Sequence, residues 1–263
     1  MELPEERIIR LKKLFKKEKV VKIEEIFKHF DVSNITIRRD LARLAKEGYI
    51  QKVHGGAIYN DPKDSNIIKS LPIFNEQVKL HPEEKDKIAR EASERIEDNN
   101  SIIIESGSTC LNIVKYLENK KNIKVSTVGI SIAFELWKLS QTRKDIQVGI
   151  AGGMISSGSN IFTGIHATNY FDMINADISF IGCTAVSVDK GISTVSMDDS
   201  LLTKSVIRSS KKIILLADSS KFEKYSFINV APLKELNEII TDNKIDLAVV
   251  KIIEETGTKI TIV

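Results

Sequence analysis

Basic and hydroxyl side chains gather in one short stretch near the start of the chain, where they alternate with apolar residues at helical spacing. The polar members of this stretch are Ser33, Asn34, Thr36, Arg38, Arg39 and Arg43. Ile37, Leu41 and Leu44 would share one face of a helix, so the polar side chains would project from the other faces. A helix that packs on one side and presents arginines on the other is suited to contact with a polyanion such as DNA.

The neighbouring elements would position this helix for reading a DNA groove. Ser33 can accept a hydrogen bond from a free amide of the first turn, which predicts that it is the N-cap. Amphipathic segments at 3–17 and 22–30 come before it, and only two residues separate the second segment from Ser33. That spacing is typical of a helix-turn-helix. Residues 48–57 predict a two-stranded wing, in which Lys52 and His54 are further candidate DNA contacts.

The distribution of charge agrees with this interpretation. Residues 1–57 hold 14 Lys and Arg against 9 Asp and Glu, a net charge of +5, whereas the remaining residues hold 25 against 27, a net charge of −2. Positive charge concentrated in one small terminal domain favours a partner that carries phosphates. Each basic residue alone would be typical of a solvated helix face, so the prediction depends on their combination with the helix order and the wing.

Composition excludes several other classes of protein. A 263-residue chain with 42% apolar and 29% charged residues is typical of a soluble globular protein of two domains. No apolar run approaches the roughly 20 residues of a membrane helix. The first residues are acidic, unlike those of a secretory signal, so we expect a cytoplasmic protein. Cys110 and Cys183 are far apart, and the four histidines are scattered. We therefore expect no metal site, no cofactor and no catalytic residue.

The rest of the chain predicts an α/β domain with a largely parallel sheet. The polar, breaker-rich stretch around 60–66 predicts a linker over residues 59–80, which separates a domain at 1–58 from one at 81–263. A helix is expected from His81 to about Glu97, with Pro82 in its first turn. Short apolar runs then alternate with helical segments. These runs are 101–104, 124–128, 146–151, 178–182, 212–217, 238–241 and 259–262.

Ligands of open α/β sheets bind beyond the carboxyl ends of the strands, which directs attention to the loops there. Residues 104–111 run from a strand into a turn that contains Gly107, Ser108 and Thr109 and suits a phosphate, although Ser and Thr at a helix start are more often simple caps. Gly152 and Gly153 follow another strand, where they would admit a ligand or form a tight turn. Residues 215–222 end a third strand in a polar cluster that includes Asp218 and Lys221.

Motifs at both ends of the chain resemble those of the DeoR-type bacterial transcriptional regulators. The DNA-binding signature of that family is similar to Val32-Ser33, Thr36 to Leu41 and His54 to Ala57 in this sequence. The second domain is similar to the family's sugar-phosphate sensor, whose fold is related to ribose-5-phosphate isomerase and coenzyme A transferases. The resemblance covers nearly the whole chain.

The resemblance implies specific effector contacts. Gly107, Ser108 and Thr109 would hold the phosphate of the effector, and Lys204, Asp218 and Lys221 would line the same pocket. Gly152 and Gly153, which belong to a further landmark of the family, are also expected to contact the effector. The chain departs from the family pattern at Glu105, where an aspartate is usual, and at Thr127-Val128, where Thr-Asn is common. A Val in place of Asn removes a hydrogen-bond donor and an acceptor, which affects the choice of effector.

We expect a transcriptional regulator that represses a carbohydrate uptake or catabolism operon and is relieved by a phosphorylated sugar. Its partners would be double-stranded operator DNA, the effector and a second or further copies of the chain, as a homodimer or homotetramer without membrane contact. One alternative is a phosphosugar isomerase-like enzyme, for which Glu105, Asp198 or Asp218 could supply a base. Another is a regulator whose second domain only oligomerises.

Overall fold

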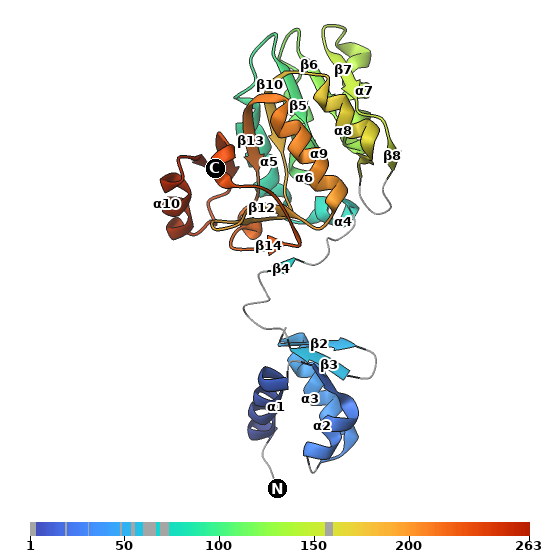
Figure 1. The fold of residues 1–263 in the computed structure, drawn as a ribbon, viewed down its shortest axis with the longest axis vertical. Helices are drawn as coiled ribbons and strands as arrows, with labels where there is room; N and C mark the ends of the chain where they lie inside the picture. Colours follow the sequence, from blue (N-terminus) through green and yellow to red (C-terminus); the bar gives the residue numbers. More distant parts are fainter. Residues whose placement is uncertain are drawn as a thin grey trace. The chain divides into compact units, whose positions relative to one another are not determined.

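The structure, a computed structural model, describes residues 4–18, 20–30, 32–47, 49–53, 56–59, 67–68, 74–155 and 160–263. The chain forms two compact units, residues 1–66 and 67–263. They are described separately (Figure 1).

The first unit is a three-helix domain with a small antiparallel sheet. Its elements in chain order are α1 (Pro4–Glu18), β1 (Val20–Lys22), α2 (Ile23–His29), α3 (Asn34–Lys46), β2 (Ile50–Val53) and β3 (Gly56–Tyr59). β2 and β3 pair as the predicted wing, and β1 pairs with the other edge of β3. Apolar side chains from all three helices meet in one core, among them Phe15, Ile26 and Leu44. The predicted helix-turn-helix with a wing is therefore confirmed.

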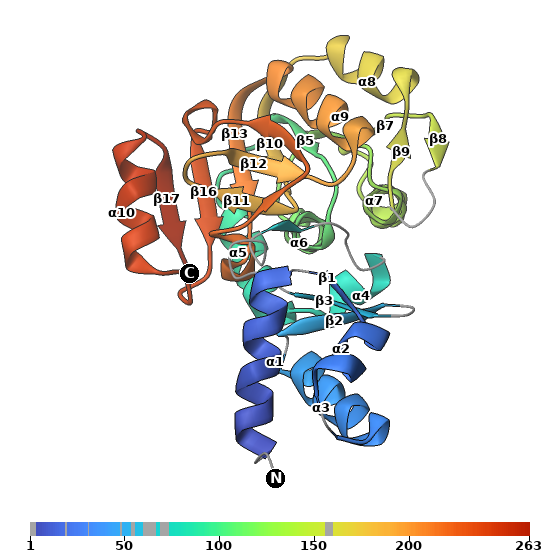
Figure 2. The same cartoon turned by 60° about the horizontal axis from the view of Figure 1, so that its bottom comes forward.

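The second unit is built on a seven-stranded parallel sheet, whose strands coincide with the seven apolar runs of the sequence. They are β5 (Ser101–Ile104), β6 (Lys124–Thr127), β7 (Gln147–Ile150), β10 (Ala176–Ile181), β13 (Ser210–Leu216), β16 (Glu238–Thr241) and β17 (Lys259–Ile262). Their order across the sheet is β17-β16-β13-β10-β5-β6-β7, so β17 and β7 are the edges (Figure 2). The chain runs outward from β5 toward β7 and from β10 toward β17. The topological switch point therefore lies between β5 and β10.

Helices cover both faces of this sheet (Figure 1). From residue 81 onward the helices of this unit are α5 (Pro82–Ser93), α6 (Ser108–Leu111), η1 (Asn112–Tyr116), α7 (Ile130–Thr142), α8 (Ile165–Asp172), α9 (Met197–Arg208), η2 (Ser219–Lys221), η3 (Leu233–Glu235) and α10 (Leu247–Glu255). α5, α6, η1 and α7 supply the core on one face, and α8, α9 and α10 supply the core on the other.

Two features of the second unit differ from the sequence prediction. The helix that begins at Pro82 ends at Ser93 rather than near Glu97, because the Ser93 hydroxyl bonds the Arg90 carbonyl and the chain turns at Arg95. The predicted linker at 59–80 contains two elements, β4 (Ile67–Ile68) and α4 (Phe74–Lys79). Both belong to the second unit, since β4 pairs with β14 (Tyr225–Ser226) and α4 packs on α6.

Short strands complete the second unit. β11 (Ala185–Ser187), β12 (Gly191–Thr194) and β15 (Ile228–Ala231) form a three-stranded antiparallel sheet. β8 (Met154–Ile155) and β9 (Phe162–Thr163) form a two-stranded one.

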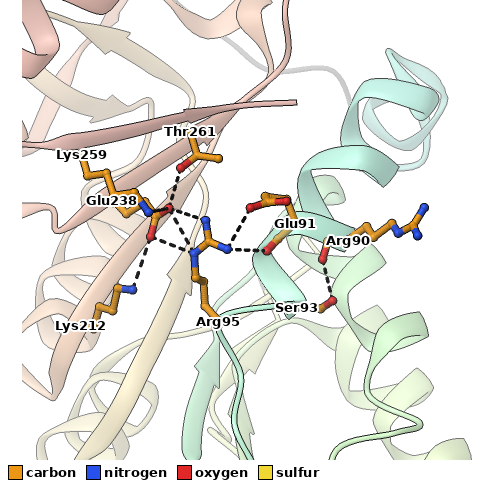
Figure 3. Close-up of polar contacts among 8 residues, drawn as sticks. All are labelled: Arg90, Glu91, Ser93, Arg95, Lys212, Glu238, Lys259 and Thr261. Atoms are coloured by element: carbon orange, nitrogen blue, oxygen red, sulfur yellow. Dashed lines mark hydrogen bonds and ion pairs between the residues drawn. The ribbon is translucent and has the colours of Figure 1, made fainter.

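A cluster of charged side chains joins the amino ends of the strands (Figure 3). Glu238, the first residue of β16, is fully buried and accepts hydrogen bonds from Arg95 at 2.8 Å, Lys259 at 2.9 Å and Thr261 at 2.7 Å. Lys212 of β13 lies 3.4 Å from its other oxygen. Burial opposes ionisation of this carboxyl, but the hydrogen bonds from Arg95, Lys259 and Thr261 outweigh it and lower the pKa of Glu238 to about 2.

Candidate functional site

The recognition helix α3 begins as the sequence predicts. Ser33 precedes it in an extended conformation, and its hydroxyl oxygen accepts a hydrogen bond from the Thr36 amide at 3.3 Å. The hydroxyls of Ser33 and Thr36 also bond each other at 2.9 Å. This cap fixes the first turn of the helix and holds both side chains at its start.

The outer surface of α3 presents polar and basic side chains to solvent. Asn34, Arg38 and Arg39 are exposed, whereas Ile37, Leu41 and Leu44 are buried in the core. Arg43 lies near the end of the helix, where its side chain pairs with Glu47 at 3.0 Å. Arg38 and Arg39 thus stand out from the helix, while the side chain of Arg43 is engaged on the protein's own surface.

A buried ion pair sets the position of α3 against α1. Asp40 follows the two exposed arginines, and its carboxylate accepts a hydrogen bond from Arg7 at 2.6 Å. Both residues are about 95% buried or more. The aspartate of the Arg38-Arg39-Asp40 sequence is therefore a structural residue, and the two arginines beside it are held on a helix that cannot turn freely.

One exposed residue of α3 was missed in the sequence analysis. Ile35 is 80% exposed at the start of the helix, next to Asn34 and Thr36. An apolar side chain at this position suits the methyl group of thymine in a major groove. Its signal in the sequence is an isoleucine that falls on the polar side of the helical pattern. Of the wing candidates, Lys52 lies in β2, and His54 lies outside the described residues.

In the second unit, a cavity of about 120 Å³ opens at the switch point, beyond the carboxyl ends of β5 and β10. Its polar lining comes from the loop after β5, the loop after β10, β12, α9 and the residue two positions before β9. These residues include Glu105, Ser106, Asn160, Cys183, Thr184, Ser193, Thr194, Asp199 and Thr203. Phe74 and Gln77 of α4 also line it. The cavity therefore offers many hydroxyl and carboxyl groups to a small polar ligand.

A smaller cavity of about 40 Å³ lies beside it and shares Gln77, Ser106, Gly107, Gly182 and Cys183 with it. Ser108, Thr109 and Lys221 complete its polar lining. In the part of the chain that the structure describes, neither hydroxyl has a hydrogen-bond partner and Lys221 has no ion pair. Two hydroxyls and an ammonium group that converge in this way suit a phosphate.

Gly107 gives this loop its shape. Its φ of +102° is a conformation that side chains rarely adopt, and a Cβ placed there would meet no atom within 4 Å. The glycine is thus required by backbone conformation, and it leaves the space beside the loop open.

Glu105 lies at the junction of the loop and the sheet. Its backbone amide donates a hydrogen bond to the Phe180 carbonyl of β10. Its backbone carbonyl accepts hydrogen bonds from the amides of Val128 and Gly129. Its carboxylate accepts hydrogen bonds from the Thr203 hydroxyl and from the Gly182 amide at 3.4 Å. The side chain is 97% buried, and burial raises the pKa of Glu105 to about 7 against these hydrogen bonds.

The structure brings together only some of the predicted effector residues. Gly107, Ser108, Thr109 and Lys221 line the smaller cavity. Asp218 is buried beside them and caps η2, where its carboxylate accepts hydrogen bonds from the amide and hydroxyl of Ser220. Asp218 therefore orders the loop that carries Lys221, and it lines neither cavity.

The other three predicted residues, Lys204, Gly152 and Gly153, line neither of these two cavities. Lys204 is half-buried on α9, one residue after Thr203, so it points about 100° away from the face that meets the cavity. Gly152 and Gly153 are exposed after β7. A Cβ on Gly153 would lie 2.4 Å from the Thr163 carbonyl oxygen, so this glycine allows β8 and β9 to pair closely.

Three further findings concern the described residues. Within the described ranges, no group of three or more His, Cys, Asp or Glu could hold a metal ion. None of the described helices is both long and apolar enough to cross a membrane. Burial raises the pKa of the Cys183 thiol to about 12, so this cavity residue is neutral.

Comparisons with known proteins agree with these features. Residues 7–63 match the DeoR-like helix-turn-helix domain, and residues 80–243 match the DeoR C-terminal sensor domain. The chain is 29% identical to the HTH-type transcriptional regulator GolR of Listeria innocua over 98% of both chains. It is 30% identical to the HTH-type transcriptional regulator IolR of Bacillus subtilis over 86% of both chains. It is 26% identical to the glycerol-3-phosphate regulon repressor of Escherichia coli over 92% of both chains.

Solved structures similar to this one include ribose 5-phosphate isomerase A from Neisseria gonorrhoeae. The identity is 21%, the TM-score is 0.39, and the match covers 56% of this chain and 55% of the other. A likeness this distant says nothing of activity. The two matched domains and the relatives that match nearly the whole chain show that this chain belongs to the DeoR family of DNA-binding transcriptional regulators.

Proposed function

We propose that this regulator represses a carbohydrate uptake or catabolism operon and that a phosphorylated sugar releases it from its operator. The observation that carries the effector proposal is the pair of adjoining cavities at the switch point. Ser108, Thr109 and Lys221 would bind the phosphate, and the hydroxyl-rich larger cavity would bind the sugar. The name of one relative, the glycerol-3-phosphate regulon repressor, agrees with a phosphorylated effector.

The proposal describes a binding site and not an active site. The chemistry of an isomerase needs a general base placed with an activated partner near the substrate. Glu105 is the candidate base, and its described hydrogen-bond partners are a hydroxyl and a backbone amide, neither of which is an acid or an electrophile.

On the DNA side, we propose that Arg38 and Arg39 contact operator DNA, one at a base edge and the other at phosphate, with Ile35 against a thymine methyl. Ser33, Asn34 and Thr36 would hold the helix start near the backbone, and Lys52 and His54 would contact DNA from the wing. One module offers few contacts, so the chain would act as a homodimer or homotetramer on a palindromic site.

Replacing either exposed arginine tests this assignment. Arg38→Ala and Arg39→Ala should each weaken binding to the protein's own promoter DNA at least about fivefold, because each removes a contact worth roughly 1–3 kcal/mol. Arg90→Ala, an exposed arginine of α5 in the second unit, serves as the control and should retain full affinity. Fluorescence anisotropy with labelled promoter DNA gives the affinities. Unchanged affinity in both α3 variants would overturn the assignment.

The route from effector to DNA would pass through the segment that joins the two units. This segment is attached to the second unit at β4 and at α4. β4 pairs with β14, whose Ser226 amide donates to the hydroxyl of Ser193 at 2.8 Å, and Ser193 lines the larger cavity. α4 contributes Phe74 and Gln77 to the cavity directly. Both attachments therefore adjoin the space that an effector would fill.

Lys85 is the buried residue that holds α4. No side chain of α4 is fully buried, and the Lys85 ammonium donates a hydrogen bond to the backbone carbonyl of Gln77. A ligand can shift an equilibrium only through contacts that differ between two states. We infer that the bound effector changes how tightly α4 is held, and that this change alters the affinity for DNA.

Removing this anchor should uncouple the two units. Lys85→Met is expected to bind the same sugar phosphate that weakens DNA binding of the native protein. Adding this compound should, however, change the affinity of the variant for operator DNA by less than about twofold. Allosteric coupling is typically about 5–150-fold. Lys87→Met, an exposed lysine two residues further along α5, is the matched control and should respond as the native protein does. A native-like response in Lys85→Met would exclude this route.

A further inference from the structure

The larger cavity has an unusual balance of charge. Among its described lining residues, Glu105, Asp199 and Cys183 are the groups that can titrate, and no lysine, arginine or histidine is present. Burial keeps Cys183 neutral, as its pKa of about 12 requires. Any charge on this wall is therefore negative.

The two carboxyls are poorly compensated by the protein. Glu105 is 97% buried and is bonded by the neutral Thr203 hydroxyl and the Gly182 amide. Asp199 lies four residues before Thr203 on α9, on the same face of the helix. Burial raises the pKa of Asp199 against a hydrogen bond with Ser196 that lowers it, and the nearby Asp198 adds to the rise. A ligand group that donates hydrogen bonds would stabilise both carboxylates, whereas a ligand anion would meet two like charges.

The smaller cavity has the opposite character. Among its described lining residues, Lys221 is the group that carries a charge. The combined site is thus polarised, with a cationic end that contains the free hydroxyls of Ser108 and Thr109 and an acidic end that contains Glu105 and Asp199.

We propose that Glu105 and Asp199 determine effector specificity by admitting phosphorylated sugars, polyols or amino sugars, whose far end is neutral or cationic, and by rejecting phosphorylated sugar acids. This inference rests on the proposed effector site and names the class of ligand that it selects. A carboxylate at the far end of the ligand would be desolvated against like charge, which weakens binding. Hydroxyl or ammonium groups would instead donate to Glu105 and Asp199.

Matched ligands test the inference directly. Calorimetry on the full chain at pH 8 would compare glucose 6-phosphate, glucosamine 6-phosphate and 6-phosphogluconate, and would compare glycerol 3-phosphate with 3-phosphoglycerate. One of the two sets, the six-carbon or the three-carbon compounds, is expected to fit the site. In that set, the compound with a neutral or cationic far end should bind at least about tenfold more tightly than the corresponding phosphorylated acid. Equal or tighter binding of the acid would overturn the inference, as would failure of every compound to bind.

Variants show whether the two carboxyls cause the discrimination. Glu105→Gln should reduce the difference in affinity between the sugar phosphate and the phosphorylated sugar acid to within about threefold. The change should come chiefly from tighter binding of the acid, because the glutamine amide has the shape of the glutamate side chain without its charge. Asp199→Asn provides an independent test if Glu105→Gln folds poorly, and Glu94→Gln, an exposed carboxyl of the same unit, is the control. Preferences that stay native in both cavity variants would overturn the inference.

This experiment separates the inference from the proposed function. Binding is measured without DNA, so discrimination against the acid can be found even if no compound releases the operator. In that case the specificity stands and the coupling fails. Conversely, release of the operator by a phosphorylated sugar acid would support the regulator and contradict this account of its specificity.

Discussion

Glu105 and Glu238 are both buried glutamates of one parallel sheet, and they lie at its opposite ends. Glu238, at the amino end of β16, accepts hydrogen bonds from Arg95, Lys259 and Thr261, and its pKa falls to about 2. Glu105, just past the carboxyl end of β5, has a hydroxyl and an amide as partners, and burial raises its pKa to about 7. The same side chain is thus fully compensated at one end and left in need of a partner at the other.

This difference follows the two ends of the sheet in the second unit. The amino ends of the strands are joined by ion pairs, which include Lys211 with Asp177 at 2.8 Å as well as the Glu238 cluster (Figure 3). The carboxyl ends surround two cavities. A residue beside a cavity whose pKa is shifted, and whose charge no protein group neutralises, is typical of a ligand-binding site.

The largest predicted effect is at the compensated end. Glu238→Gln should lower the free energy of unfolding by about 1–3 kcal/mol, because it removes the charge to which the partly buried Arg95 and the more exposed Lys259 donate hydrogen bonds. Urea unfolding followed by the fluorescence of Trp137, the single tryptophan, reports on the second unit. Glu235→Gln, an exposed neighbour in η3, should change stability by less than about 0.5 kcal/mol. A loss below about 1 kcal/mol at Glu238 would contradict this description of the cluster.

Glu105→Gln should have an effect that depends on pH. The pKa of Glu105 is raised from 4.5 to about 7 on folding, so the stability linked to its neutral form is fully present below pH 4.5 and is lost as pH rises through 7. Glutamine is neutral throughout and removes this loss. The difference in melting temperature between the variant and the native protein should therefore shift in favour of the variant from pH 5 to pH 8. If the difference in melting temperature between the two proteins is the same at pH 5 and at pH 8, the pKa of Glu105 is not raised on folding.

The smallest predicted effect concerns the outermost member of the Glu238 cluster. Lys212 lies 3.4 Å from the Glu238 carboxylate with its side chain 38% exposed. Solvent screens such a pair, so Lys212→Met should cost less than about 1 kcal/mol by the same urea measurement. A loss as large as that of Glu238→Gln would mean that the cluster depends on all of its cations equally.

The main sheet was predictable from sequence, whereas the short strands were not. Strands buried on both faces are continuous apolar runs, and β16 and β17 match the predicted runs exactly in extent. β8, β9 and β14 have two residues each, which is too short for a pattern to develop. Their positions depend on tertiary pairing, as the contact of β14 with the distant β4 illustrates.

The candidate site was predictable where it follows the strands. The loops of Gly107 to Thr109 and of Lys221 could be placed at one end of the sheet because parallel strands bring their carboxyl ends together. Phe74 and Gln77 could not be found, since they lie on a helix within a stretch whose composition predicted a linker. On α9 the sequence drew attention to Lys204, but packing turns Asp199 and Thr203 toward the cavity.

The central claim is that a phosphorylated effector bound at the carboxyl end of the sheet controls DNA binding. The most direct measurement is the fluorescence anisotropy of promoter DNA bound to the native protein and to Lys221→Met. Each complex is titrated with glucose 6-phosphate, glucosamine 6-phosphate and glycerol 3-phosphate. We predict that one compound releases DNA from the native protein, and that Lys221→Met binds DNA equally well but needs at least about tenfold more of the compound. Release at the same concentration from both proteins, or from neither, would contradict the claim.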